Sequence, residues 1–99
     1  MSVNRVPILI KPVSLDAWRM QAAKLFRQQL WGVFQIRQVL WARSGNTHTA
    51  RLLGTAHGRE IYVDVPIADD DLRGGDLEMY VPIIAMHVEN LFEEENRGN

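Results

Sequence analysis

The sequence predicts a single small α+β domain, with an antiparallel sheet covered by two helices on one face. Three observations support this fold class. Ninety-nine residues with 46% hydrophobic content are enough for one core. Two segments repeat apolar residues with the period of an amphipathic helix, and the segments between them alternate as strands do. The predicted order is β-α-β-β-β-α over residues 1–99, with fraying expected at residues 96–99.

The first third of the chain contains a predicted strand and the clearest predicted helix. Residues 5–11 are rich in β-branched and aliphatic side chains, and Pro7 places this strand at a sheet edge or at its own start. Ser14 is a good N-cap, and Asp16 suits the positive end of a helix dipole. Apolar residues then recur at helical spacing, so we expect a helix over about 15–30.

Three strands are predicted next, in meander order. Residues 33–43, 48–56 and 61–67 are rich in β-branched, aromatic and alternating residues. The segments "SGNT" and "HGRE" between them have the composition of tight turns. The three strands are therefore expected to form an antiparallel sheet.

The alternation in the first of these strands predicts which side chains face the helices. Phe34, Ile36 and Leu40 are expected to point inward. The opposite face would then carry Gln35, Arg37, Val39, Trp41 and Arg43, joined by Arg51, Leu53, Tyr62 and Asp64 from the neighbouring strands. A slip of one residue would exchange the two faces and bury Trp41.

The last third begins with "ADDDLRGGD", residues 68–76, which has the Asp and Gly content of a solvated loop. A helix is predicted over about 81–95, because apolar residues recur there at helical spacing and Pro82 is tolerated in a first turn. Residues 77–81 fit either a short strand or the lead-in to this helix.

Charge is divided unevenly along the chain. Residues 1–59 hold nine Lys and Arg against one acid, whereas residues 60–99 hold eleven acids against two Arg, although the net charge of the whole chain is −1. Such a division is typical of chains that use charge to interact with a partner or with a second copy. Cysteine is absent, which fits a reducing compartment, and a cytoplasmic location is the default.

No motif in the sequence identifies a reaction or a metal site. Asp69, Asp71 and Gly74 match three positions of a calcium loop, but Arg73 and Tyr80 occupy positions where that loop needs ligands. The three histidines match no zinc spacing, and no hydroxyl lies in a nucleophile motif. We therefore predict no catalytic residue, no metal and no cofactor, although an apolar ligand pocket between the helices and the sheet remains an alternative.

The predicted α-β-β-β-α order from residue 14 onward resembles the double-stranded RNA-binding domain in outline. That family depends on a Lys-rich N-terminus of its last helix. Here the corresponding helix carries Glu89, Glu93, Glu94 and Glu95, which would repel phosphate. The resemblance therefore concerns element order alone.

The leading functional hypothesis is a non-enzymatic interaction module that forms a homodimer through its sheet face or an edge strand and binds a protein partner. No membrane association is predicted, because the longest apolar runs are about four residues. The first alternative is a nucleic-acid-binding domain that uses the same basic and aromatic face. The second is an inhibitor whose acidic surface imitates nucleic acid. The candidate interaction surface comprises Arg37, Trp41, Arg43, Arg51 and Tyr62, and the acidic surface comprises Asp69, Asp70, Asp71, Asp76, Glu89, Glu93 and Glu94.

Overall fold

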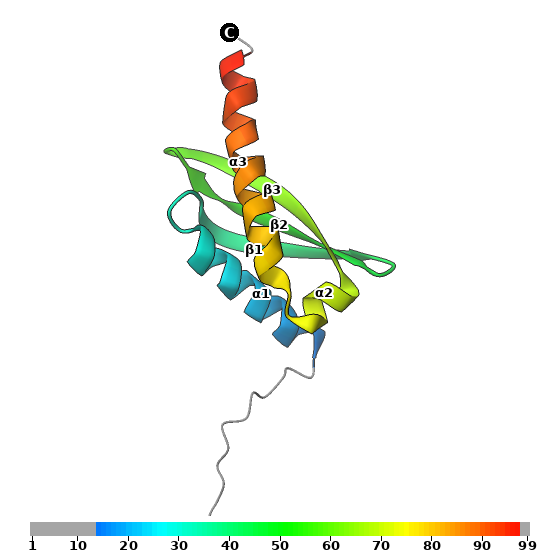
Figure 1. Ribbon diagram of the computed structural model, residues 1–99. Helices are drawn as coiled ribbons and strands as arrows, with labels where there is room; N and C mark the ends of the chain where they lie inside the picture. The colour runs from blue at the N-terminus through cyan, green and yellow to red at the C-terminus, as the bar shows by residue number, and fades with distance from the viewer. Residues whose placement is uncertain (1–13, 98–99) are drawn as a thin grey trace, which may run out of the picture.

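The computed structural model describes residues 14–97 as a helix, a three-stranded antiparallel sheet and a second helical region (Figure 1). In chain order the elements are α1 (Leu15–Leu30), β1 (Gln35–Ser44), β2 (Thr47–Ala56), β3 (Arg59–Ala68), α2 (Asp69–Gly74), the 3-10 helix η1 (Leu77–Met79) and α3 (Tyr80–Arg97). The strand expected at residues 5–11 lies outside the described residues. The described order is therefore helix, three strands, helices, and it differs from the expected β-α-β-β-β-α.

The first helix starts where its capping signals predict. The Ser14 side chain accepts a hydrogen bond of 3.1 Å from the backbone N–H of Ala17, and Asp16 lies in the first turn. At the other end, the backbone N–H of Phe34 donates to the Leu30 carbonyl at 2.7 Å. This bond closes the end of α1 and leads the chain directly into β1.

The three strands form a meander whose turns depend on residues in the left-handed region. Gly45 lies in the β1–β2 turn with φ of 61°. His57 and Gly58 connect β2 to β3 with φ values of 53° and 76°. Two consecutive positive φ values are the signature of a type I′ turn, whose twist matches that of the flanking strands.

A β-bulge at Arg37 changes which side of β1 faces the core. Ile36 pairs with Gly54, but Gln38 pairs with Leu53, so β1 advances two residues while β2 advances one. The expected alternation is therefore wrong beyond Ile36. Val39 and Trp41 pack against the core, whereas Leu40 is exposed on the opposite face.

Glycine is required opposite the bulge. A Cβ built on Gly54 would lie 2.1 Å from the backbone oxygen of Gln35 and 2.8 Å from the Cα of Ile36. Both contacts involve backbone atoms, so no side-chain movement could relieve them. Gly54 thus allows the start of β1 to pass close over β2.

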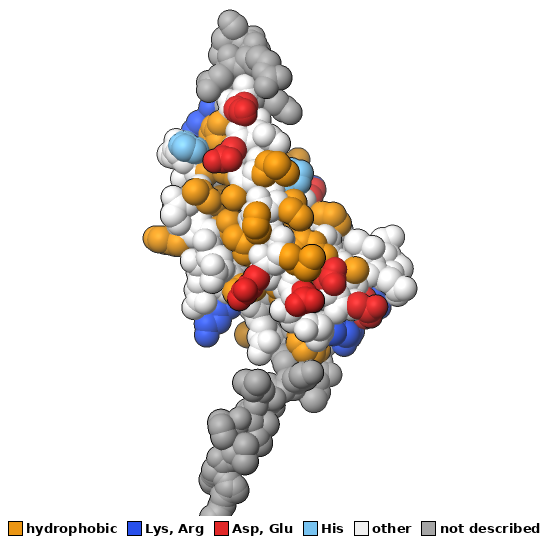
Figure 2. All heavy atoms as spheres, in the orientation of Figure 1, with side chains coloured by type: hydrophobic (Ala, Val, Ile, Leu, Met, Phe, Trp, Pro, Cys, Tyr) orange, Lys and Arg blue, Asp and Glu red, His pale blue; other side chains and the backbone are white. Residues whose placement is uncertain are grey.

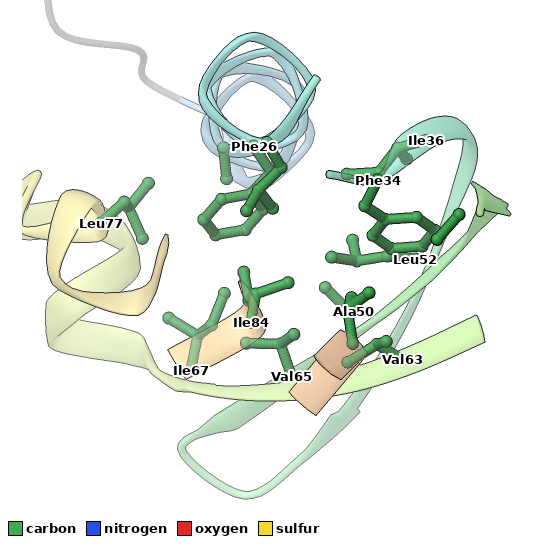
Figure 3. Packing of buried hydrophobic residues seen from close by; sticks show 14 of the residues in the cluster. Phe26, Phe34, Ile36, Ala50, Leu52, Val63, Val65, Ile67, Leu77 and Ile84 are labelled. Carbon is green, nitrogen blue, oxygen red and sulfur yellow. The ribbon is translucent and has the colours of Figure 1, made fainter. Parts of the chain in front are cut away.

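The core lies between one face of the sheet and the two long helices. Phe26 from α1 and Ile84 from α3 point toward Leu52 and Val65 on the sheet, as Figure 3 shows. All four belong to one cluster of buried residues that includes Phe34 and Leu77. Because α1 and α3 both contribute to this cluster, we call the sheet face beneath it the inner face.

The acidic segment after β3 is a short helix, so the expectation of a loop at residues 68–76 is wrong. Leu72 is fully buried and anchors α2 to the core, and Gly75, with φ of 91°, ends the helix. The segment at residues 77–81 is helical lead-in: η1 passes directly into α3. Helix α3 starts at Tyr80 and continues to Arg97, two residues beyond its expected end.

Candidate interaction surfaces

The sheet face turned away from α1 and α3 is open to solvent within the described part of the chain. We call it the outer face and define it by Leu40, Thr49, Arg51, Leu53, Tyr62 and Asp64. Leu40 is 46% exposed and Tyr62 is 54% exposed, which is high for large apolar and aromatic side chains. A sheet of three strands thus buries one face and leaves the other uncovered.

Arg51 organises the centre of the outer face. Its Nε and Nη2 donate to the two carboxylate oxygens of Asp64 at 2.8 and 2.9 Å, and its guanidinium carbon lies 4.4 Å from the centre of the Tyr62 ring. The Arg51 hydrogen bond lowers the pKa of Asp64, and the same bond raises the pKa of Arg51. Both side chains are partly exposed, so the pair stabilises the fold little but fixes the guanidinium over the ring.

A shallow hollow adjoins this pair. It has a volume of about 220 Å³ and is lined by Leu40, Ala42, Thr49, Arg51 and Asp64 together with Trp41. The hollow combines an apolar wall with one end of the Arg51–Asp64 pair. The outer face is therefore exposed to solvent and also has a hollow in its surface.

The structure divides the five residues of the predicted interaction surface between two sides of the sheet. Arg51 and Tyr62 are neighbours on the outer face, and Arg37 at the bulge places its Nη2 3.3 Å from Glu60 of β3. Trp41 and Arg43 lie on the inner side instead, because the bulge reverses the alternation of β1. The five residues thus do not form one continuous surface.

The inner-side residues of that set have structural partners. Trp41 is half-buried against the core, and the guanidinium carbon of Arg19 lies 5.3 Å from its ring centre. Arg43 donates from Nε to the backbone oxygen of Gly45 at 3.0 Å and approaches Asp69 to 3.8 Å. Both side chains help to close one end of the core.

The charge division of the sequence is partly offset by pairing between elements. Arg37 with Glu60, Arg51 with Asp64 and Arg43 with Asp69 each join a base from the first 59 residues to an acid from the last 40. The meander brings these groups together, because β2 lies between β1 and β3 and pairs with both. Opposite charges on the sheet therefore meet in pairs, while the glutamates of α3 belong to none of these three pairs.

A buried polar network lies on the inner side near the β1–β2 turn. His48 is 0% exposed, and its Nε2 lies 2.7 Å from Oδ1 of Asp69 while its Nδ1 lies 3.4 Å from Nη2 of Arg19. A guanidinium can only donate, so Nδ1 accepts and the proton resides on Nε2, which donates to Asp69. Arg73 adds a contact from its Nε, which lies 3.1 Å from each Asp69 oxygen.

This network supports the fold, and the Nε of Arg19 is buried within it without a hydrogen-bond partner among the described residues. The hydrogen bond from His48, followed by that from Arg73, lowers the pKa of Asp69. His48 has both ring nitrogens occupied and no contact with solvent, so it could not act on a substrate in this conformation. Sequence reasoning missed its role, yet the signal was present: His48 alternates with Ala50 and Leu52, both fully buried.

The residues of the predicted acidic surface have mixed roles. Asp69 belongs to the buried network, and Asp71 accepts a hydrogen bond from the Tyr80 hydroxyl. Burial and that bond raise the pKa of Tyr80. Of the remaining members, Asp70, Asp76, Glu89 and Glu93 are exposed, and Glu94 belongs to α3.

Helix α3 carries a second apolar side, which sequence reasoning did not identify as a surface. Met79, the last residue of η1, is 59% exposed, and Ile83 and Met86 of α3 are 43% and 51% exposed, with Pro82 exposed beside them. We call these four residues the α3 stripe. Figure 2 shows apolar side chains gathered along this helix, with acidic side chains toward both ends.

Within residues 14–97, no three or more His, Asp or Glu side chains come together in a way that could hold a metal ion. None of the helices in this part of the chain is both long and apolar enough to cross a membrane. Comparison of the chain with protein-family models, curated proteins and solved structures gives no significant match. The surfaces themselves are therefore the basis for a functional proposal.

Proposed function

We propose that the chain is a non-enzymatic interaction module that forms a homodimer through the outer face of its sheet and binds a protein partner. The observation that carries this proposal is the uncovered outer face, on which exposed Leu40 and Tyr62 flank the Arg51–Asp64 pair. Exposed apolar side chains that share one face favour association, because association removes them from water.

The charge balance of the outer face also favours pairing with a second copy. In a two-fold dimer each surface meets itself, so a strongly charged face would place like charges opposite each other. Arg51 and Asp64 neutralise one another within the chain, at 2.8 and 2.9 Å. Two such faces can therefore approach without net repulsion.

The residue types on this face support a binding role. Tyrosine and arginine concentrate binding energy in protein interfaces, particularly when their orientation is fixed before binding. Tyr62 and Arg51 are already stacked at 4.4 Å. Strand β1 is also an edge of the described sheet, which allows pairing along that edge as a variant of the same homodimer.

The two alternatives have less support. Arg37, Arg43 and Arg51 each have a carboxylate partner, which reduces the positive field that a nucleic-acid-binding face requires. An acidic inhibitor would use the acidic surface, but Asp69 and Asp71 are engaged within the chain. The nucleic-acid alternative predicts binding to nucleic acid that weakens as salt is added. The inhibitor alternative predicts binding to basic proteins.

The test is the molecular mass in solution, measured by light scattering over a concentration series for the full chain and two variants. We expect a dimer for the natural sequence, persisting at high salt, and a monomer for the double variant Leu40→Ala with Tyr62→Ala. Loss of two central contacts should weaken the dimer by about tenfold or more. Met20→Ala is the matched control, since Met20 is 72% exposed on α1 and distant from the outer face.

Two results would contradict the proposal. One is a natural chain that stays monomeric at every concentration. The other is a dimer whose stability is the same in the double variant and in the Met20→Ala control. Circular dichroism of each variant confirms that a change in mass reflects association and not unfolding.

A further inference from the structure

We propose that the α3 stripe is a docking site for a basic amphipathic helix of a partner protein. The stripe lies on a different element from the outer face and adjoins it at Asp64, which lines the hollow beside the stripe, so this proposal does not require the homodimer. It rests on three observations: an apolar helix side that the core does not use, acidic side chains beside it, and a hollow beside it.

Helix α3 is apolar on two sides, and the core uses only one. Ile84 and Val88 are fully buried, as expected for a helix that covers a sheet. Met79, Ile83 and Met86 are separated by four and three residues, so they line up on another side of the helix. A surface helix with this second apolar row offers a place where another helix can lie along it.

The charged side chains that η1 and α3 place beside the stripe are acidic, whereas Arg59 of β3 lies against Phe92 on another side of α3. Glu78, Glu89 and Glu93 are exposed, and within residues 14–93 none of them has an ion-pair partner. The sequence contains no Lys or Arg from Gly74 to Asn96. The outer face differs in this respect, because its central charges cancel. An apolar row with acidic neighbours selects a helix whose own apolar row has basic neighbours.

The same charge argues against a second α3 as the occupant. Two copies of this stripe facing each other would bring glutamates of one chain against glutamates of the other. A basic helix is instead attracted to those glutamates. The methionines suit this role, because unbranched flexible side chains adapt to the contours of a docked helix.

A hollow of about 200 Å³ beside the stripe could receive an anchoring side chain. It lies between α3 and the edge of β3 and is lined by Val65, Pro66, Tyr80 and Ile83, with Asp64 and His87 at its polar part. A large apolar side chain of the docked helix would fill this space while its basic residues reach the glutamates. Such an anchor in a pocket is where interfaces concentrate binding energy.

The test uses the full chain and two synthetic helical peptides of about 18 residues, long enough to follow α3. The basic peptide has Leu at four positions of one helix side and Lys or Arg elsewhere, and the acidic control has the same Leu positions with Glu in place of the bases. We expect the basic peptide to bind and to lose affinity as salt is added, and the acidic control not to bind.

Variants of the chain locate the site. The double variant Ile83→Ser with Met86→Ser should weaken binding of the basic peptide by about tenfold or more, whereas Met20→Ser should leave it unchanged. Glu89→Lys with Glu93→Lys leaves the apolar row intact, and it should weaken binding at low salt and reduce the salt dependence. This second variant keeps the test decisive if the first is poorly folded.

Three outcomes would overturn the proposal. The acidic control could bind as well as the basic peptide, or the basic peptide could bind equally to the chain and to both double variants. In the third outcome, the natural chain would self-associate and only Ile83→Ser with Met86→Ser would dissociate it, which would make a second copy the occupant. Failure of the homodimer is recognised separately, because Leu40→Ala with Tyr62→Ala changes mass without affecting peptide binding.

Discussion

The two faces of β2 differ strongly in burial. On the inner face His48, Ala50, Leu52 and Ala56 are all fully buried, whereas Thr49, Arg51, Leu53 and Thr55 on the outer face are partly or largely exposed. Because the residues alternate along one strand, both sets share the same backbone and the same pairing. The comparison shows that the inner face holds the fold together, which leaves the outer face available for binding.

The largest expected effect is a difference in the loss of stability when two adjacent leucines, one on each face of β2, are replaced. Leu52→Ala removes a fully buried side chain from the core and should lower the free energy of unfolding by about 3 kcal/mol. Leu53→Ala, one residue along and on the outer face, should cost less than about 1 kcal/mol. Urea denaturation of both variants measures the difference. Equal costs would show that the two faces do not differ in the way described.

A smaller effect on the free energy of unfolding is expected when the pH is lowered. It compares the two aspartates whose side chains form hydrogen bonds with side chains of β2. Asp69 bonds inner-face His48 and Asp64 bonds outer-face Arg51, and both aspartates have a lowered pKa in the folded state. The unfolded chain therefore binds more protons, so each pair contributes stability above the ordinary aspartate pKa of about 3.9 and loses it as pH falls through the folded pKa.

Denaturation between pH 7 and pH 2 checks this expectation. Asp69→Asn should reduce the acid sensitivity more than Asp64→Asn, because a buried imidazole and Arg73 both bond Asp69, whereas the Arg51 pair is exposed and screened by salt. Asp70→Asn, a neighbour in the same turn, is the matched control. A larger change in Asp64→Asn than in Asp69→Asn would contradict the assignment of the stronger contact to the inner face.

The smallest effect on stability is expected at the centre of the outer face. Arg51→Gln removes the pair with Asp64 and the stacking on Tyr62, yet an exposed pair of this kind contributes little to the free energy of unfolding. The same substitution should weaken the proposed homodimer clearly, because Asp64 would then face the second copy without its partner. Urea denaturation and light scattering on one sample give both values. A large loss of stability with an unchanged mass would contradict this expectation, because the outer face would then serve folding and not association.

Local signals in the sequence were sufficient for most of the fold. Ser14 caps α1 as predicted, and α1 spans Leu15–Leu30, the predicted range. The strands and turns lie within two residues of their predicted positions, since β-branched runs separated by Gly and Asn have few other solutions. The acidic segment was misassigned because Asp and Gly are common both in loops and at helix starts. Burial of Leu72, a tertiary contact, favours the helix over the loop.

The candidate surfaces were harder to predict, and the reasons are physical. The bulge at Arg37 has no side-chain signature in β1, and its clearest requirement is Gly54 on another strand, which fits only because β1 passes so close. Trp41 was consequently assigned to the wrong side. The placement of Arg51 and Asp64 on one face followed from simple alternation in β2 and β3, which have no bulge between them. The α3 stripe required knowledge of which side of the helix the core occupies.

The bulge has a consequence for how this strand tolerates changes in length. Deletion of one residue at Arg37 would restore regular alternation in β1 without altering any other residue. Leu40 would still pair with Arg51 on the outer face, and Val39 and Trp41 would still face the helices, because Arg37 is the one residue of β1 that the pairing with β2 skips. A deletion at the bulge therefore leaves the residues beside Arg51 in place. A deletion farther along β1 would instead exchange the two faces for every residue that follows it.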